Sequence, residues 1–206
     1  MIRKILFAIQ SRRPTRQISH LGNPYMERTY LGTAFGVRVY LHRFVACDED
    51  GVHDHPFLRS ISLLVAGWYF EDRWARRYRR VWLNLLGPND MHRVVLPDNG
   101  KDVWTLFAHS ARVKPWGMLR ATALDKHGPR YEYRPESSQD DPAYSDWSKD
   151  LTGAQLRAAG KMFSIPLGMN AYSAGLLEYP EDARQHPSKL KTPFLHVARQ
   201  GSSAQM

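Results

Sequence analysis

Residues 47–67, CDEDGVHDHPFLRSISLLVAG, decide how the middle of this chain folds. Three acidic residues and a glycine come first, two histidines with a fourth acid between them follow, and a proline precedes an apolar run. The polar cluster predicts a turn, and the run at 60–66 predicts a buried strand. His53 and His55 therefore stand at the entrance of a strand, either in a polar turn or at the start of a metal site.

The composition predicts a soluble, folded protein. Of the 206 residues 43% are hydrophobic, and the longest apolar runs fall far short of the roughly 18 residues that span a bilayer. We therefore expect no membrane partner. Cys47 is the only cysteine, which excludes an internal disulfide and a thiolate zinc cluster. A single thiol favours a cytoplasmic location, in a bacterium or a phage-infected cell.

The net charge of +9 favours anionic partners. Five arginines lie between Arg73 and Arg80, in the run RWARRYRR, and two aromatic residues lie among them. Guanidinium groups pair with phosphates and aromatic rings stack on bases, so this run is one candidate for a nucleic-acid surface. The alternative is a solvated hairpin whose arginines keep an exposed strand from pairing with other chains.

Alternation with a period of two dominates residues 35–133. We expect strands at 36–46, 60–66, 68–72, 80–86, 92–96, 103–109, 118–122 and 130–133. The turn sequences DEDG, GPND, PDNG, KPWG and KHGP lie between them. Short strands at this spacing, without a helical period between them, predict an all-β core built as an antiparallel sandwich or barrel.

The remainder of the chain divides into two further parts. Residues 1–23 form a basic N-terminal segment, residues 24–134 the β-barrel, and residues 135–206 a linker plus a helical C-terminal extension. In the extension, Thr152 and Gln155 have the spacing of a capping box, and Pro166 ends the helix that they begin. This extension either covers the mouth of the barrel or forms a homodimer interface.

The two histidines of the opening stretch have a partner later in the chain. On an extended segment His53 and His55 point to the same face, and His92 again follows a Gly-Pro turn and precedes an apolar strand. Three neutral imidazoles suit Fe(II), Mn(II), Ni(II), Cu(II) or Zn(II) and leave positions open for water, dioxygen or substrate. Taken singly, each histidine is equally typical of a turn or a strand start.

These motifs resemble those of the cupin superfamily. GVHDHPFLRSISLLVAG resembles the first cupin motif, and GPNDMHRVV resembles the second. Together with YMERTYL, VYLHRFVACDEDGVHDHPF and WTLFAHSARVKPWGML, they resemble uncharacterised cupin-like proteins of bacteria and their phages, over residues 24–134. The resemblance implies a jelly-roll barrel, also called a double-stranded β-helix, with His53, His55 and His92 as metal ligands.

The chain departs from the cupin pattern at one position. Where the first motif usually has a glutamate ligand, the spacing leads to Arg59 or Ser60, which are not usual ligands of a divalent cation. This difference favours a three-histidine site, of the kind that thiol dioxygenases of the superfamily use. Glu71 is either a replacement carboxylate or, as we expect, a surface acid beside Asp72.

Other residues are candidates for binding substrate or moving protons. In the strand 36–46, Tyr40 and His42 share a face and lie either inside the barrel or at its rim. Inside, they would bind substrate or act as acid or base. Arg59 occupies the region of the usual glutamate, so we name it as the group that would pair with an anionic substrate.

Three functions are consistent with these candidate site residues. The first is a non-haem Fe(II) dioxygenase that uses three histidines to oxidise a small anionic substrate. The second is a non-redox isomerase or epimerase, in which Zn(II) or Mn(II) polarises a carbonyl group. The third is a non-catalytic phage accessory protein that binds nucleic acid or a host factor. Because a fold hosts many activities, fold alone does not choose among them.

Overall fold

The computed structural model describes the chain except for residues 21, 49–51, 74–75, 126–127, 137–145 and 185–206. Most of the predicted linker therefore lies outside the described residues. The elements in chain order are α1 (Ile2–Arg12), β1 (Thr15–His20), β2 (Asn23–Ala34), β3 (Val37–Phe44), β4 (Ser60–Ala66), β5 (Tyr69–Arg73), β6 (Arg76–Arg80), β7 (Leu83–Leu86), β8 (Arg93–Val95), β9 (Val103–His109), β10 (Trp116–Asp125), β11 (Gly128–Glu136), the 3-10 helix η1 (Trp147–Lys149), α2 (Gly153–Ala158) and α3 (Glu181–Arg184).

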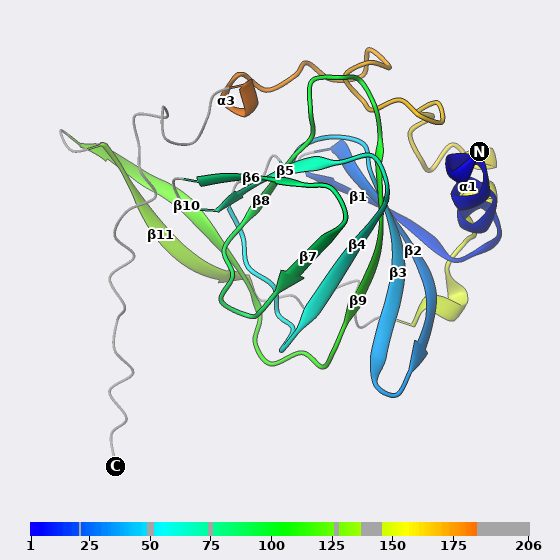
Figure 1. Ribbon diagram of the computed structural model, residues 1–206, viewed down its shortest axis with the longest axis horizontal. Helices are drawn as coiled ribbons and strands as arrows, with labels where there is room; N and C mark the ends of the chain where they lie inside the picture. The colour runs from blue at the N-terminus through cyan, green and yellow to red at the C-terminus, as the bar shows by residue number, and fades with distance from the viewer. Residues whose placement is uncertain (21, 49–51, 74–75, 126–127, 137–145, 185–206) are drawn as a thin grey trace.

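The core of the chain is all-β and antiparallel, with small helical parts at its two ends (Figure 1). One sheet has the strand order β1-β2-β3-β9-β4-β7, a smaller sheet has the order β6-β5-β8, and β10 and β11 form a hairpin. A hydrophobic cluster that includes Phe44, Leu64, Tyr69 and Val95 draws side chains from both sheets. The core therefore lies between the two sheets, as in a jelly roll.

Strand pairing arranges the inner face of the large sheet in rows. In one row Arg28 of β2 lies opposite His42 of β3, which lies opposite Thr105 of β9. In the next row Tyr40 lies opposite Phe107. Directly opposed residues share a face, and all five of these side chains are buried. Of the two positions weighed for Tyr40 and His42, the structure shows the interior of the barrel.

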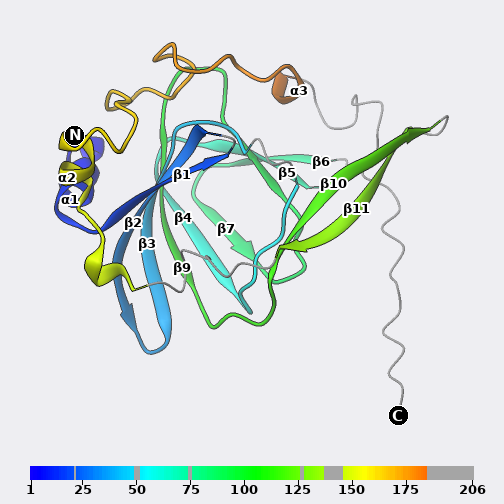
Figure 2. The ribbon, with the colours of Figure 1, turned by 180° about the vertical axis from the view of Figure 1, so that it is seen from behind.

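The outer face of the same sheet is covered by α1. Leu6 of α1 packs with Leu41 and Trp104, so α1 lies against this face (Figure 2). The buried guanidinium of Arg43 donates to Asp102 (2.8 Å) and to the carbonyl oxygen of Pro166 (2.7 Å). Arg43 therefore attaches the C-terminal segment to the barrel. No helix in the described part of the chain is long and apolar enough to cross a membrane.

Several boundaries differ from the sequence prediction. The strands predicted at 60–66 and 103–109 match β4 and β9, but 80–86 is divided, because β6 pairs with β5 whereas β7 pairs with β4. The chain passes from one sheet to the other at Val81 and Trp82. Residues 1–23, to which we assigned no element, contain α1 and β1. Their many basic residues obscured both periodic patterns.

The capping box predicted at the C-terminal helix is confirmed. The Thr152 hydroxyl accepts from the backbone N–H of Gln155, and the Gln155 side chain accepts from the backbone N–H of Thr152. The helix ends earlier than predicted, since α2 stops at Ala158 and Gly160 has a φ of 64°. Gly153 lies so close to α1 that a Cβ there would be 2.7 Å from the Gln10 carbonyl oxygen.

Candidate metal centre

Backbone pairing brings the three histidines together. His53 lies between β3 and β4, His92 lies directly before β8, and the two residues exchange backbone hydrogen bonds of 2.9 and 2.8 Å. The imidazole rings of His53, His55 and His92 have centroids 4.9–5.5 Å apart. One nitrogen from each ring lies within 4.8 Å of the others, and the Nε2 atoms of His55 and His92 are 2.7 Å apart.

Glu71 determines how His92 faces this cluster. Its Oε1 atom lies 2.9 Å from His92 Nδ1, so Nδ1 carries the proton and donates it to the carboxylate. The lone pair of Nε2 then points at the cluster. Carboxylates commonly support a metal-ligating histidine in this way, fixing the tautomer and the ring orientation. Glu71 acts as a support for His92 rather than as a fourth member of the histidine group.

The expectation that Glu71 is a surface acid is wrong, because its side chain is 0% exposed. It accepts from Asn84 Nδ2 (2.7 Å) and Arg80 Nε (2.7 Å), and Arg73 Nε lies 3.0 Å away. Burial by itself would raise the pKa of Glu71, but the hydrogen bonds, foremost that from His92, hold it at about 2. Glu71 is therefore ionised and fully partnered at neutral pH.

Several arginines of the arginine-rich hairpin form ion pairs within the protein. Arg73 and Arg80 neutralise Glu71, and Arg77 forms an ion pair with Asp72 at 2.6 Å. Arg79, which is exposed, has its guanidinium carbon 4.3 Å from the centroid of the Trp68 ring. Trp74, part of the candidate nucleic-acid surface, lies outside the described residues. A nucleic-acid partner for this hairpin stays a prediction.

The surroundings of His55 keep it neutral. Burial, together with the neighbouring His92 and His53, holds the pKa of His55 well below its usual value. Metal ligation requires a deprotonated imidazole, so His55 is ready to ligate without releasing a proton. The Trp116 ring lies 5.0 Å from that of His55 and covers it. His53 is the more open ligand candidate, with 16% of its side chain exposed.

Asp54, between the two histidines of the HxH segment, has a structural role. Its carboxylate accepts from the backbone N–H of Gly117 and from the Tyr133 hydroxyl, both at 2.9 Å, and pairs with the ammonium group of Lys114. These contacts attach the segment to the hairpin β10–β11. Asp54 faces away from its neighbours, so His53 and His55 both point to the opposite side of the segment.

The donor set fits a first-row divalent metal ion. All three donors are imidazole nitrogens, which bind such ions at about 2.0–2.1 Å. The His55–His92 contact of 2.7 Å between two Nε2 atoms brings the lone pair of His92 onto His55. His55 and His92 would each offer an imidazole nitrogen to such an ion. His53 supplies the third donor.

The other predicted site residues lie at different distances from the cluster. The His42 ring stacks on Phe107 at 4.9 Å, and Phe107 in turn lies 6.1 Å from the ring of His55. Tyr40 is one row further along, stacked on His109 at 5.6 Å. Arg59 is exposed immediately before β4 and does not join the side chains around the cluster. The strand alternates, so Ser60 faces inward and Arg59 outward.

Sequence reasoning overlooked Arg28. Its Nε atom donates to His42 Nε2 at 3.2 Å, and Arg28 is only 9% exposed. The alternation of Met26, Arg28 and Tyr30 in YMERTYL was an available signal, because these residues share the inner face of β2. We assigned no strand to this stretch, so its arginine was not placed.

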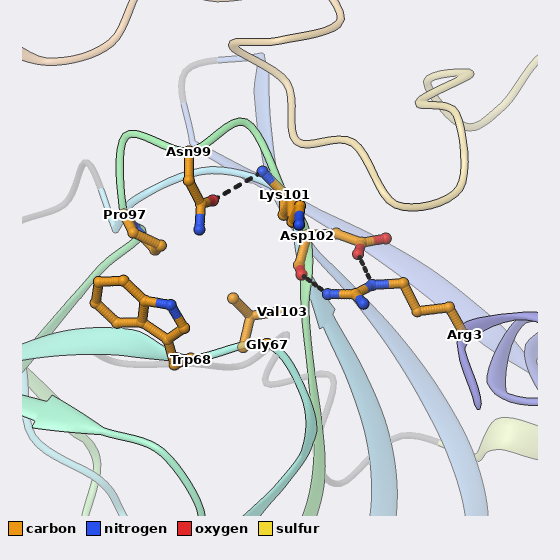
Figure 3. Close-up of a pocket in the computed structure, with 8 residues that line it drawn as sticks. All are labelled: Arg3, Gly67, Trp68, Pro97, Asn99, Lys101, Asp102 and Val103. Atoms are coloured by element: carbon orange, nitrogen blue, oxygen red, sulfur yellow. Dashed lines mark hydrogen bonds and ion pairs between the residues drawn. The ribbon is translucent and has the colours of Figure 1, made fainter. Parts of the chain in front are cut away.

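A surface pocket lies away from the histidines, beside the start of α1 (Figure 3). Among the residues that line it, Arg3 donates to Asp102 at 2.7 Å, and the Lys101 backbone N–H donates to the Asn99 side chain at 3.0 Å. Asp102 also accepts from Arg43, so its charge is already compensated. The pocket shares no residue with the histidine cluster and is not the candidate centre.

No family model matches this chain, and no curated protein matches it. Among solved structures, Fe(II) HppE in complex with substrate has a TM-score of 0.40 at 8% identity, over 47% of this chain and 56% of HppE. The match therefore spans little more than half the length of HppE.

Two further structures carry the cupin name. A cupin-2 domain protein from Shewanella frigidimarina has a TM-score of 0.35 at 6% identity, over 41% of this chain and 79% of its own. A cupin superfamily protein from Desulfitobacterium hafniense has a TM-score of 0.34 at 11% identity, over 41% and 76%. The two-sheet antiparallel core has a cupin-like, jelly-roll fold, and the histidine cluster lies where the HxH segment meets the start of β8.

Proposed function

We propose that this chain is a metal-dependent cupin enzyme that holds Fe(II) with His53, His55 and His92 and oxidises a small anionic substrate with dioxygen. The observation that carries the proposal is the buried pair of His92 and Glu71, which aims a lone pair into a group of three imidazoles. A purely structural histidine at a strand start has no need of a fully buried carboxylate behind it.

The charge of the ligand set supports an anionic substrate. Three neutral imidazoles leave both positive charges of a divalent ion uncompensated, whereas the usual glutamate ligand would remove one of them. The nearby carboxylate of Glu71 does not alter this balance, because Arg73 and Arg80 already pair with it. An anionic substrate would therefore be attracted to the centre.

The residues around the cluster would have distinct roles in this function. When bound, Fe(II) would supply the redox chemistry with dioxygen. Glu71 holds His92 in one tautomer, while Trp116 and Phe107 pack near His55 and limit water there. The Nε2 lone pair of His42 is occupied by Arg28, so His42 presents its Nδ1 proton as a donor rather than acting as a base.

The test is a spectroscopic titration under anaerobic conditions. Fe(II) is added to metal-free protein, nitric oxide is added as a dioxygen analogue, and the spectrum of the nitrosyl complex is recorded for the wild type and for His55→Gln. His109→Gln is the matched control, because His109 is a buried histidine of the same barrel outside the cluster. We expect the signal in the wild type and control, and its loss in His55→Gln.

Other results would point to the competing functions. A folded protein that binds no metal through these histidines would contradict the proposal. Binding of Zn(II) or Mn(II) without any iron–nitrosyl signal would favour a non-redox isomerase or epimerase. Salt-sensitive binding of DNA or RNA that survives His55→Gln would favour an accessory protein that uses the arginine-rich hairpin.

A further inference from the structure

We infer that Arg28, together with His42 and Thr105, forms a subsite inside the barrel that binds the oxyanion group of the substrate, a carboxylate or a phospho group. This inference deepens the proposed function, since it names what holds the anionic part of the substrate. The inference rests on the proposed function only for the reaction that the bound molecule undergoes. Binding of the oxyanion itself does not depend on it, because an arginine subsite binds an oxyanion with or without a metal nearby.

Arg28 is a buried cation without a counter-charge. It is 9% exposed, and its Nε atom donates to His42. Its guanidinium carbon lies 5.7 Å from the centroid of the Tyr40 ring. Among the described residues, no carboxylate forms an ion pair with it. Buried charges in proteins are normally paired, so this arrangement is unusual.

Arg43, which lies on the adjacent strand β3 and on the opposite face of the sheet, shows how a buried arginine is paired in this protein. It is 1% exposed and pairs with Glu27 at 3.2 Å and with Asp102 at 2.8 Å. Both arginines are buried in the same sheet, yet only Arg43 has acidic partners in the described part of the chain. The described residues therefore provide no anionic partner for Arg28, and an anion from outside the chain would fill that role.

His42 does not supply the missing charge. Burial, with contributions from Arg28 and His109, holds the pKa of His42 well below its usual value, so the ring is neutral. It accepts a hydrogen bond from Arg28 through Nε2 and thereby fixes the orientation of the guanidinium. The terminal nitrogens of that guanidinium offer the parallel N–H donors that suit carboxylate and phospho oxygens.

Thr105 provides a second polar group in the same row. It lies directly opposite His42 on the inner face and is 0% exposed. Its hydroxyl oxygen has no hydrogen-bond partner among the described residues. Buried hydroxyl groups normally have a hydrogen-bond partner. A bound oxyanion would give Thr105 that partner and would give Arg28 its counter-charge.

The row lies beside the histidine cluster, with one aromatic ring between them. Phe107 separates His42 from His55, with ring distances of 4.9 and 6.1 Å. An anion held by Arg28 would thus present the rest of the molecule toward the cluster.

The test uses metal-free protein, so that it is independent of Fe(II) chemistry. The melting temperature is followed as sodium phosphate or sodium acetate is added at constant ionic strength, against sodium chloride, for the wild type, Arg28→Met and Arg59→Met. We expect saturable stabilisation of the wild type by at least one oxyanion, and the preferred one distinguishes a phospho group from a carboxylate. Arg59→Met, a matched control at an exposed arginine, should bind like the wild type.

Arg28→Met should lose at least tenfold in affinity for the oxyanion, and without ligand it should melt no lower than the wild type, because it removes an uncompensated buried charge. An arginine with a merely structural role would instead leave a less stable variant. Thr105→Val, which keeps the shape of the side chain, should weaken binding several-fold and serves if Arg28→Met does not fold. Unchanged affinity in the folded variants, or a wild type that responds to neither anion, would overturn the inference.

Discussion

Replacing Glu71 by glutamine is expected to weaken metal binding more than it weakens the fold. The substitution keeps the shape of the side chain but removes the charge that accepts from His92 (2.9 Å), Arg80 (2.7 Å) and Asn84 (2.7 Å). Loss of a carboxylate behind a ligating histidine typically costs 10- to 100-fold in metal affinity. We therefore expect a loss of about 10- to 100-fold for Glu71→Gln.

The effect on stability follows from the partners that stay behind. Arg73 and Arg80 lose an ionic partner, but they are 22% and 25% exposed, so water screens part of their charge. A buried hydrogen bond to a charged group contributes about 1.5–3 kcal/mol, and we expect a decrease of about 2–3 kcal/mol in the free energy of unfolding. The variant should remain folded at room temperature.

The assay is a competition titration of Zn(II) or Co(II) against a chromophoric chelator, with urea unfolding of the metal-free proteins alongside. Glu27→Gln is the matched control, because Glu27 is a buried carboxylate in an ion network that contains Arg43 and Gln10 but no member of the histidine cluster. It should lose stability and keep its metal affinity. Equal metal affinity in Glu71→Gln and the wild type would refute the role assigned to Glu71.

Three further predictions concern the fold. Arg43→Met removes the buried cation that pairs with Glu27 and Asp102, although Asp102 keeps Arg3, so the free energy of unfolding in urea should fall by about 3–5 kcal/mol; a change below about 1 kcal/mol would contradict the role of Arg43 as the partner of both carboxylates. Gly153→Ala brings a Cβ within 2.7 Å of the Gln10 carbonyl oxygen, so it should cost about 1–3 kcal/mol and speed proteolysis at α2, whereas unchanged stability and cleavage would contradict the close packing. Cys47 is 0% exposed and burial raises the pKa of its thiol, so thiol reagents should modify it only as the protein unfolds; rapid labelling of the native protein would contradict its position.

The parts of the fold that the sequence predicts well are those with clean local alternation. The strands at 60–66 and 103–109 have uninterrupted apolar alternation between turn residues, and they match β4 and β9. The run 80–86 has the same local character, yet it is shared by two sheets. Which neighbour a strand pairs with depends on distant residues, so local pattern does not reveal the change of sheet at Trp82.

In the candidate site, too, local pattern predicted some residues, whereas others depended on distant pairing. The shared parity of His53 and His55, and the repeated turn before His92, were enough to expect that these residues lie together. Glu71 could not be placed, because two adjacent acids near several arginines are also typical of a solvated surface. Only the pairing of β5 with β8, in which Glu71 lies opposite Val94, brings that carboxylate beside His92.

Arg59 and Arg28 illustrate opposite errors. Spacing from the cupin motif singled out Arg59, but the alternation of β4 turns Ser60 inward and leaves Arg59 exposed. Arg28 was not considered because its strand, β2, was not predicted. The antiparallel pairing of β2 with β3 sets Arg28 opposite His42, although the two residues are 14 positions apart in the sequence.

The central claim is that His53, His55 and His92 hold one Fe(II) ion. The most direct measurement is the metal content of protein purified anaerobically from its native host, for the wild type and for His55→Gln. The account predicts about one equivalent of iron per chain in the wild type and its loss in the folded variant. Folded wild-type protein that carries no metal, or a metal content that His55→Gln leaves unchanged, would contradict it.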